Sequence, residues 1–95
     1  MTSQVEQIQK KIFPILQQHH VIRAGLFGSL VTGHLRADSD IDILVELGPD
    51  TSLLDLVALK LDLEDALDRS VDLTEYPMIP PRLSKRILQE EVRVL

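Results

Sequence analysis

The chain has 95 residues, 44% hydrophobic and 26% charged, so one globular domain over residues 1–95 is expected. A net charge of −5 and an aromatic content of 3% argue against direct binding of long nucleic acid, which needs clustered cations and stacking rings. The sequence has no signal-peptide pattern and no apolar run long enough for a membrane helix, which indicates a cytoplasmic protein with no membrane contact. Because it has no cysteine, a metal ion would need oxygen or histidine ligands.

The first half of the chain alternates helix and strand patterns. Ser3 begins a capping-box pattern, and the apolar residues after it recur at helical spacing, which predicts a helix over about 4–18 that Pro14 kinks or ends early. Residues 21–27 then predict a strand broken by Gly25. A turn or short helix is expected next, before a second strand over 41–47.

The second half continues the alternation. Ser52 has the position of a helix cap, with Asp55 as its reciprocal partner, and the helix is expected to reach about Leu67. Leu54 and Leu61 widen its apolar face beyond what one sheet covers, which fits either a well-covered core helix or a surface for a partner. A short strand over 70–74, a helix over about 81–91 and an edge strand over 92–95 complete the order. This order predicts an α/β fold with a small mixed β-sheet flanked by helices.

The acidic pair Asp40 and Asp42 is the strongest functional signal. In a strand, alternate side chains share a face, so the two carboxylates are expected to project together. Adjacent carboxylates repel, and a divalent cation between them, alone or carrying bound phosphates, relieves that repulsion. Asp72 repeats the pattern in a second short strand and is expected to complete a metal-binding triad. Oxygen ligands of this kind favour Mg²⁺ or Mn²⁺.

Gly28 and Ser29, at the end of the first predicted strand, form the other part of the predicted site. Glycine allows close approach of a ligand to the backbone, and a serine hydroxyl with free amides attracts phosphate oxygens. Alone, the pair is as typical of an ordinary turn. A Walker A loop from Gly28 to Gly33 is excluded, because His34 and Leu35 occupy the positions of its lysine and hydroxyl residue.

The run Leu26-Phe27-Gly28-Ser29, followed by Gly33 and by Asp38-Ser39-Asp40-Ile41-Asp42-Ile43-Leu44-Val45, resembles the signature of the polymerase-β-type nucleotidyltransferase superfamily. Within it, the chain is most similar to the minimal nucleotidyltransferases, often MntA-type antitoxins encoded beside a HEPN-domain toxin. The resemblance covers almost the whole chain, and Asp72 matches the third carboxylate. It implies a polymerase-β-type nucleotidyltransferase core.

The resemblance also implies an activity, namely transfer of a nucleoside monophosphate, AMP from ATP, to a hydroxyl such as a tyrosine of the HEPN-type toxin. Two Mg²⁺ ions, or Mn²⁺, would assist. By this likeness Asp40, Asp42 and Asp72 are the expected catalytic and metal-binding residues, with Asp72 also assisting deprotonation of the acceptor. Gly28 and Ser29 would hold the outer phosphates. A hetero-oligomer with the toxin is expected.

One departure from the family pattern concerns the segment between the two glycines. Many relatives carry an arginine there, whereas this chain has Leu30, Val31 and Thr32, and Arg36 is a candidate to replace the missing charge. Two alternatives therefore stay open. The chain could be a catalytically decayed antitoxin that neutralises its toxin by binding alone, or a nucleotidyltransferase that modifies a small molecule.

Overall fold

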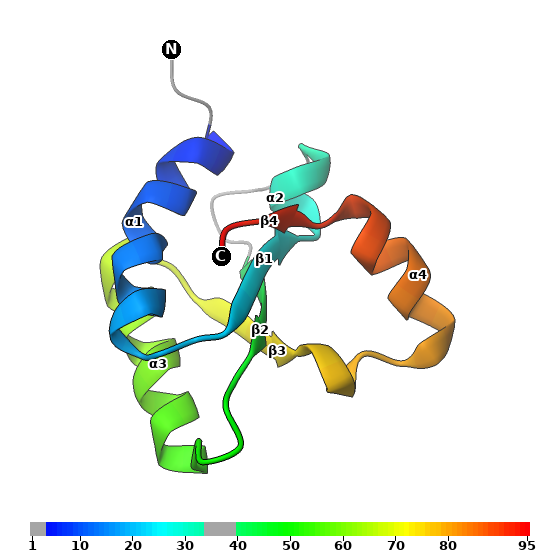
Figure 1. The fold of residues 1–95 in the computed structure, drawn as a ribbon. Coiled ribbons are helices and arrows are strands. Elements are labelled where there is room, and N and C mark those ends of the chain that lie inside the picture. Colours follow the sequence, from blue (N-terminus) through cyan, green and yellow to red (C-terminus); the bar gives the residue numbers. More distant parts are fainter. Residues whose placement is uncertain (1–3, 34–39) are drawn as a thin grey trace.

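The computed structural model describes residues 4–33 and 40–95, and it shows a mixed four-stranded sheet between helices (Figure 1). The elements in chain order are α1 (Gln4–Gln18), β1 (Arg23–Phe27), α2 (Ser29–Thr32), β2 (Ile41–Glu46), α3 (Leu53–Leu67), β3 (Val71–Glu75), the 3-10 turn η1 (Tyr76–Met78), α4 (Pro81–Glu90) and β4 (Val92–Arg93). The α/β order and the mixed sheet are confirmed. The expectations for Ser3, His34, Leu35, Arg36, Asp38 and Ser39 lie outside the described residues.

The strand order in the sheet is β3-β2-β1-β4. Strand β1 pairs antiparallel with β2 and with β4, whereas β2 and β3 run parallel. The register places Phe27 opposite Asp42, and Asp42 beside Asp72. The end of β1 therefore adjoins the beginnings of β2 and β3 at one edge of the sheet.

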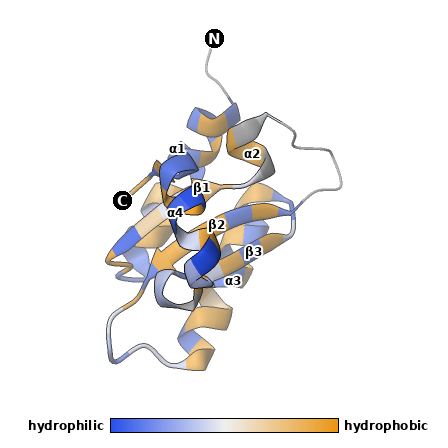
Figure 2. Ribbon diagram, turned by 90° about the vertical axis from the view of Figure 1, so that its right-hand side faces the viewer, coloured by the Kyte–Doolittle hydropathy of each residue, from blue (hydrophilic) through white to orange (hydrophobic). Residues whose placement is uncertain are grey.

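The main core lies between the sheet and the helices α1 and α3, which pack on the same face (Figure 1). Buried core positions recur at helical spacing on the two helices and at alternate positions on the strands: Ile8, Ile12, Leu16, Leu59, Leu63, Leu67, Ala24, Leu26, Ile41, Ile43, Val45 and Val71. Burial of each larger aliphatic side chain contributes about 1.5–3 kcal/mol. Helix α4 stands on the opposite side of the sheet, in front of it in Figure 2.

Helix α1 does not end early at Pro14 but continues to Gln18. Proline removes one helical hydrogen bond, which disfavours a helix interior. Here Ile12 and Leu16, on either side of Pro14, are 0% exposed, so their burial holds both turns against the core. None of the helices in the described ranges is long and apolar enough to cross a membrane.

Gly25 does not break β1, contrary to expectation. It pairs with Leu44 on one side and with Arg93 on the other. Its role is to leave space, because a Cβ atom at Gly25 would lie 2.5 Å from Cγ of Glu91. The glycine therefore lets the segment after α4 lie directly on the sheet.

Helix α3 begins as expected. The Asp55 amide donates to Oγ of Ser52 at 3.2 Å, and the Ser52 amide donates to the Asp55 carboxylate at 3.0 Å. These bonds complete a capping box and hold the pKa of Asp55 below its ordinary value. The helix ends at Asp68, whose backbone is left-handed with φ 52°.

Candidate active site

The predicted carboxylates come together at one edge of the sheet. Asp42 is the second residue of β2, and Asp72, the second residue of β3, is its neighbour in the parallel register. Asp40 precedes β2 by one residue. Ile41, Ile43 and Val71 are buried in the main core. Because side chains alternate along a strand, Asp42 and Asp72 project from the other face of the sheet.

Asp42 occupies an electrostatically unfavourable position. Its side chain is half-buried, whereas Asp40 and Asp72 are exposed. Burial, followed by the negative charges of Asp72 and then Asp40, raises the pKa of Asp42 from 3.8 to about 6. A positive charge beside Asp42 would relieve this repulsion. Strongly raised carboxyl pKa values of this kind are characteristic of functional sites.

Gly28 lies against the Asp42 carboxylate. Its φ of +74° is in the left-handed region, and a Cβ atom built there would overlap Oδ2 of Asp42. The carbonyl of Gly28 accepts a hydrogen bond from the Val31 amide at 3.1 Å, which closes the turn from β1 into α2 at Ser29. Gly33 has a similar φ of +82°, but within residues 4–33 and 40–95 no heavy atom beyond its chain neighbours lies within 4 Å of such a Cβ. Gly28 is thus required for space as well as for backbone conformation.

The three carboxylates are neighbours but do not form a finished metal site. Among residues 4–33 and 40–95, no three His, Asp or Glu side chains are grouped so that they could hold a metal ion as they stand. The donor set nevertheless fits a hard divalent cation, because it consists of carboxylate oxygens around an Asp42 whose pKa is raised by burial and by uncompensated negative charge.

A second polar cluster on the same face of the sheet has no signal in the sequence. Arg23 donates to Glu91 at 3.2 Å, and the Glu91 side chain is only 3% exposed. The Arg23 guanidinium also lies 4.2 Å from the centroid of the Tyr76 ring. Burial and the Glu91 carboxylate raise the pKa of the Tyr76 hydroxyl. The cluster holds the chain that follows α4 against β1, and its three residues are too far apart in sequence for spacing to reveal them.

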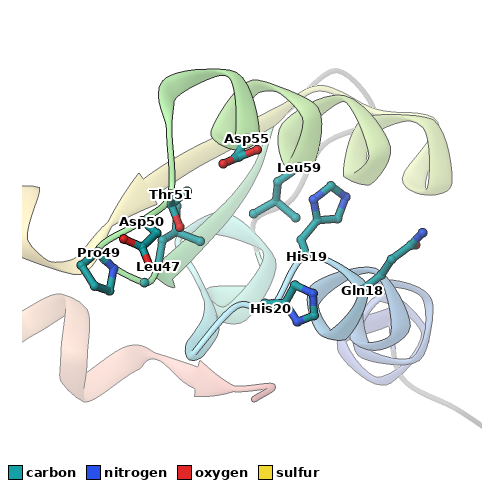
Figure 3. Close-up of a pocket in the computed structure, with 10 residues that line it drawn as sticks. Gln18, His19, His20, Leu47, Pro49, Asp50, Thr51, Asp55 and Leu59 are labelled. Atoms are coloured by element: carbon teal, nitrogen blue, oxygen red, sulfur yellow. The ribbon is translucent and has the colours of Figure 1, made fainter.

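A cavity of about 430 Å³ lies away from Asp40, Asp42 and Asp72 (Figure 3). Its wall includes His19, His20, Leu47 and Asp50, and His19 contacts Asp62 at 2.7 Å. Leu47 follows the end of β2, five residues after Asp42, which corresponds to about 16 Å along a strand. The carboxylates therefore lie outside this cavity, and we assign the chemistry to the open edge where Gly28 and Asp42 meet.

Comparison with known proteins agrees with this geometry. The family model described as "Polymerase beta, Nucleotidyltransferase" matches residues 10–95. A Methanocaldococcus jannaschii protein, provisionally named a protein adenylyltransferase, is 50% identical over 91 residues, which are 96% of this chain and 98% of that protein. The protein adenylyltransferase MntA of Thermococcus cleftensis is 40% identical over 70 residues, covering 74% of this chain and 71% of its own length.

The fold also matches solved structures. A crystal structure of a toxin-antitoxin with AMP-PNP superposes with a TM-score of 0.77 at 26% identity, and the match covers 92% of this chain and 72% of that one. The matched family model spans nearly the whole sequence, including every residue of the proposed site. The chain therefore belongs to the polymerase beta nucleotidyltransferase family.

Proposed function

We propose that this chain transfers AMP from ATP to a hydroxyl group of a HEPN-type partner toxin, and acts as the antitoxin of that pair. The observation that carries the proposal is the half-buried Asp42, which lies against Gly28 and between the charges of Asp40 and Asp72. The negative charges of Asp72 and Asp40 repel the Asp42 carboxylate, and a divalent cation bound at this edge would relieve that repulsion. The relatives named as protein adenylyltransferases support the reaction class.

Mg²⁺, or alternatively Mn²⁺, is the proposed cofactor, as two ions. Asp40, Asp42 and Asp72 would hold them, because the charges of Asp72 and Asp40 lie close enough to Asp42 to raise the pKa of its carboxyl. When bound, such ions would neutralise phosphate charge and lower the pKa of an attacking hydroxyl. Gly28 and Ser29, at the turn where β1 ends, are the proposed contacts of the outer phosphates.

The transfer can be written as an in-line displacement. The acceptor oxygen forms a bond to the α-phosphorus of ATP, and the bond from that phosphorus to the bridging oxygen breaks, with its electron pair leaving on pyrophosphate. Asp72, exposed at the beginning of β3, is proposed to take the acceptor proton and pass it to solvent. Asp42 is proposed to position the reactants by its fixed place beneath Gly28.

The partner is proposed from the relatives. A similar fold has been solved in a toxin-antitoxin with AMP-PNP, an ATP analogue. For this chain we propose a hetero-oligomer with a HEPN-type toxin encoded nearby, working as a single domain in the cytoplasm, where ATP is available. The acidic net charge of −5 makes direct nucleic-acid binding by this chain unfavourable.

The test is label transfer from α-labelled ATP with Mg²⁺ to the HEPN protein encoded beside the chain. We expect the wild type to label it and Asp42→Asn to reduce the rate by at least about 100-fold, the scale of loss of an electrostatic site residue. Asp50→Asn is the matched control, because it removes the same charge from an exposed position in the loop between β2 and α3. Absence of label at every partner concentration would contradict the proposal.

A binding-only antitoxin is the second candidate. Two points favour it. Leu30, Val31 and Thr32 stand where the resemblance to the family implies an arginine, and the carboxylates do not form a finished ligand group in the described structure. Protection of cells from the toxin decides between the two. If the Asp42→Asn variant still protects, binding alone is sufficient; if it forms the complex without protecting, transfer is required.

A further inference from the structure

Helix α3 carries an apolar face that points away from the core. Its inner residues Leu59 and Leu63 are at most 1% exposed, whereas Leu54 is 79% exposed and Leu61 57%. An α-helix turns by 100° per residue, so residues three or four positions apart lie in a line along its surface. On the outer side of α3 this line begins with apolar residues and ends with acidic ones. We call this line the outer stripe, and its members are Leu54, Val57, Leu61, Asp65 and Asp68.

The outer stripe is prominent among the exposed apolar residues. Leu53, Leu54, Val57 and Leu61, all on the first nine residues of α3, are 45–79% exposed. In both ribbon views the beginning of α3 projects beyond the sheet, and Figure 2 shows its hydrophobic turns at the lower end of the molecule. Contiguous exposed apolar surface of this kind marks interaction sites.

A small cavity lies beside the apolar end of the outer stripe, because Leu53, the residue before Leu54, lines it. It has a volume of about 260 Å³, and its apolar side is formed by Leu47, Leu53 and Leu56. Glu75, at the end of β3, contributes a carboxylate that makes no ion pair within residues 4–33 and 40–95. A cavity with an aliphatic wall and a carboxylate suits a long basic side chain, whose methylene groups pack while its charge meets the acid.

The charges around the stripe define the partner's chemistry. From Leu53 to Asp68 the sequence has five acidic residues and only Lys60 as a basic one. Both Asp65 and Asp68 are exposed and continue the line of the apolar residues. We propose that the outer stripe binds a basic amphipathic helix of a partner protein, with apolar residues at three- and four-residue spacing and with cations that meet Asp65, Asp68 and Glu75.

A second copy of this chain fits the same surface poorly. A pair of copies would bring together two outer stripes whose charged members, Asp65 and Asp68, are all acidic. Each copy also carries a net charge of −5. Like charges opposed across an interface cost affinity, so the pattern favours a basic partner.

The experiment uses synthetic helical peptides of about four turns as probes. Two peptides are compared, and both have the same stripe of leucines. The basic peptide has lysines beside the stripe, and the acidic peptide has glutamates at the same positions. Binding to the full chain is followed by fluorescence anisotropy. We expect the basic peptide to bind at least about tenfold more tightly than the acidic one.

Variants locate the surface. Leu54→Gln/Leu61→Gln should weaken binding of the basic peptide by at least about tenfold, since glutamine keeps helix propensity but removes the apolar contact. Asp65→Asn/Asp68→Asn should reduce the preference for the basic peptide, and asparagine tolerates the left-handed backbone at Asp68. The matched control is Leu83→Gln on α4, where the residue is 39% exposed. Circular dichroism verifies that each variant is folded.

Four outcomes would overturn the inference. These are no binding, equal binding of both peptides, binding that survives the Leu54→Gln/Leu61→Gln change, and a dimer of the chain that the same change dissociates. The Asp42→Asn variant should bind the peptide as the wild type does, because Asp42 lies at the sheet edge away from α3's first turns. A failure of AMP transfer and a failure of this surface are therefore distinguishable.

Discussion

Replacement of Asp42 by asparagine should make the metal-free protein more stable, although the same change is expected to reduce AMP transfer. Asparagine is a neutral isostere of the protonated aspartic acid side chain. The charged carboxylate is half-buried beside two further acids, and its pKa in the folded protein is about 6 instead of 3.8. The folded state therefore resists ionisation of this group, and ionisation weakens the fold.

The sign follows from proton binding. Between about pH 4 and pH 6 the folded protein retains a proton on Asp42 that the unfolded chain has released, so stability falls as pH rises through this window. Below it, Asp42 is neutral in both states and the variant should resemble the wild type. Above it, the full penalty of the charged side chain is present in the wild type and absent in the variant.

The magnitude has a ceiling of about 3 kcal/mol, since each pKa unit corresponds to 1.36 kcal/mol. Solvent reaches part of the Asp42 side chain and screens the repulsion, so we expect a gain of about 1–2 kcal/mol. For a domain of this size, each 1 kcal/mol raises Tm by about 4–8 °C. The gain should therefore be measurable at about pH 8 and should shrink toward pH 4.

The assay is urea and thermal unfolding, followed by circular dichroism in a chelating buffer over that pH range. Asp50→Asn, which replaces an exposed carboxylate in the loop between β2 and α3, is the control and should show no comparable pH-dependent gain. Addition of Mg²⁺ should then stabilise the wild type and not Asp42→Asn, because a ligand stabilises only the state that binds it. A variant equal to or less stable than the wild type at pH 8, or a gain that does not change with pH, would refute the reasoning.

Two glycine substitutions test the packing of the same face. Gly28→Ala should reduce AMP transfer by at least about 100-fold, because the added Cβ displaces the Asp42 carboxylate. Gly33→Ala carries a similar backbone cost without an overlap among the described residues, so it should lose stability but keep its activity. Equal activities of the two variants would contradict the close approach of Gly28 to Asp42. Gly25→Ala should lower the free energy of unfolding, measured in urea, by about 1–3 kcal/mol, because the Glu91 side chain must move from its place over β1. Gly48→Ala is the control and should change stability little, because no described atom lies near its added Cβ. A Gly25→Ala variant as stable as this control would show that Glu91 moves without cost.

Local sequence signals determined the helices and strands and placed their ends within two residues of the observed ones. The capping box of Ser52 and Asp55 begins α3, and the alternation of apolar and polar residues around Asp42 indicates β2. Both signals can be read from the sequence because capping hydrogen bonds and side-chain periodicity involve residues only a few positions apart. Asp42 and Asp72 could be singled out because carboxylates are disfavoured among the apolar residues of a strand, and Asp40 could be singled out by its spacing of two residues from Asp42.

Where local propensity competes with packing, the tertiary structure decided the outcome. Pro14 favours a helix end, but the burial of Ile12 and Leu16 outweighs one missing hydrogen bond. Gly25 suggested an interruption, but it provides space for Glu91, which comes from the other end of the chain. No pattern along the sequence encodes a contact between residues so far apart.

The relation between the acids also came only from the fold. The sequence placed Asp42 and Asp72 in two strands, but the parallel pairing of β2 with β3 makes them neighbours, and the antiparallel pairing with β1 brings Gly28 onto Asp42. Likewise the leucines of α3 were recognisable in sequence, yet only the packed sheet shows which of them remain outside. Strand register and burial depend on the whole chain, because each results from contacts that close long loops.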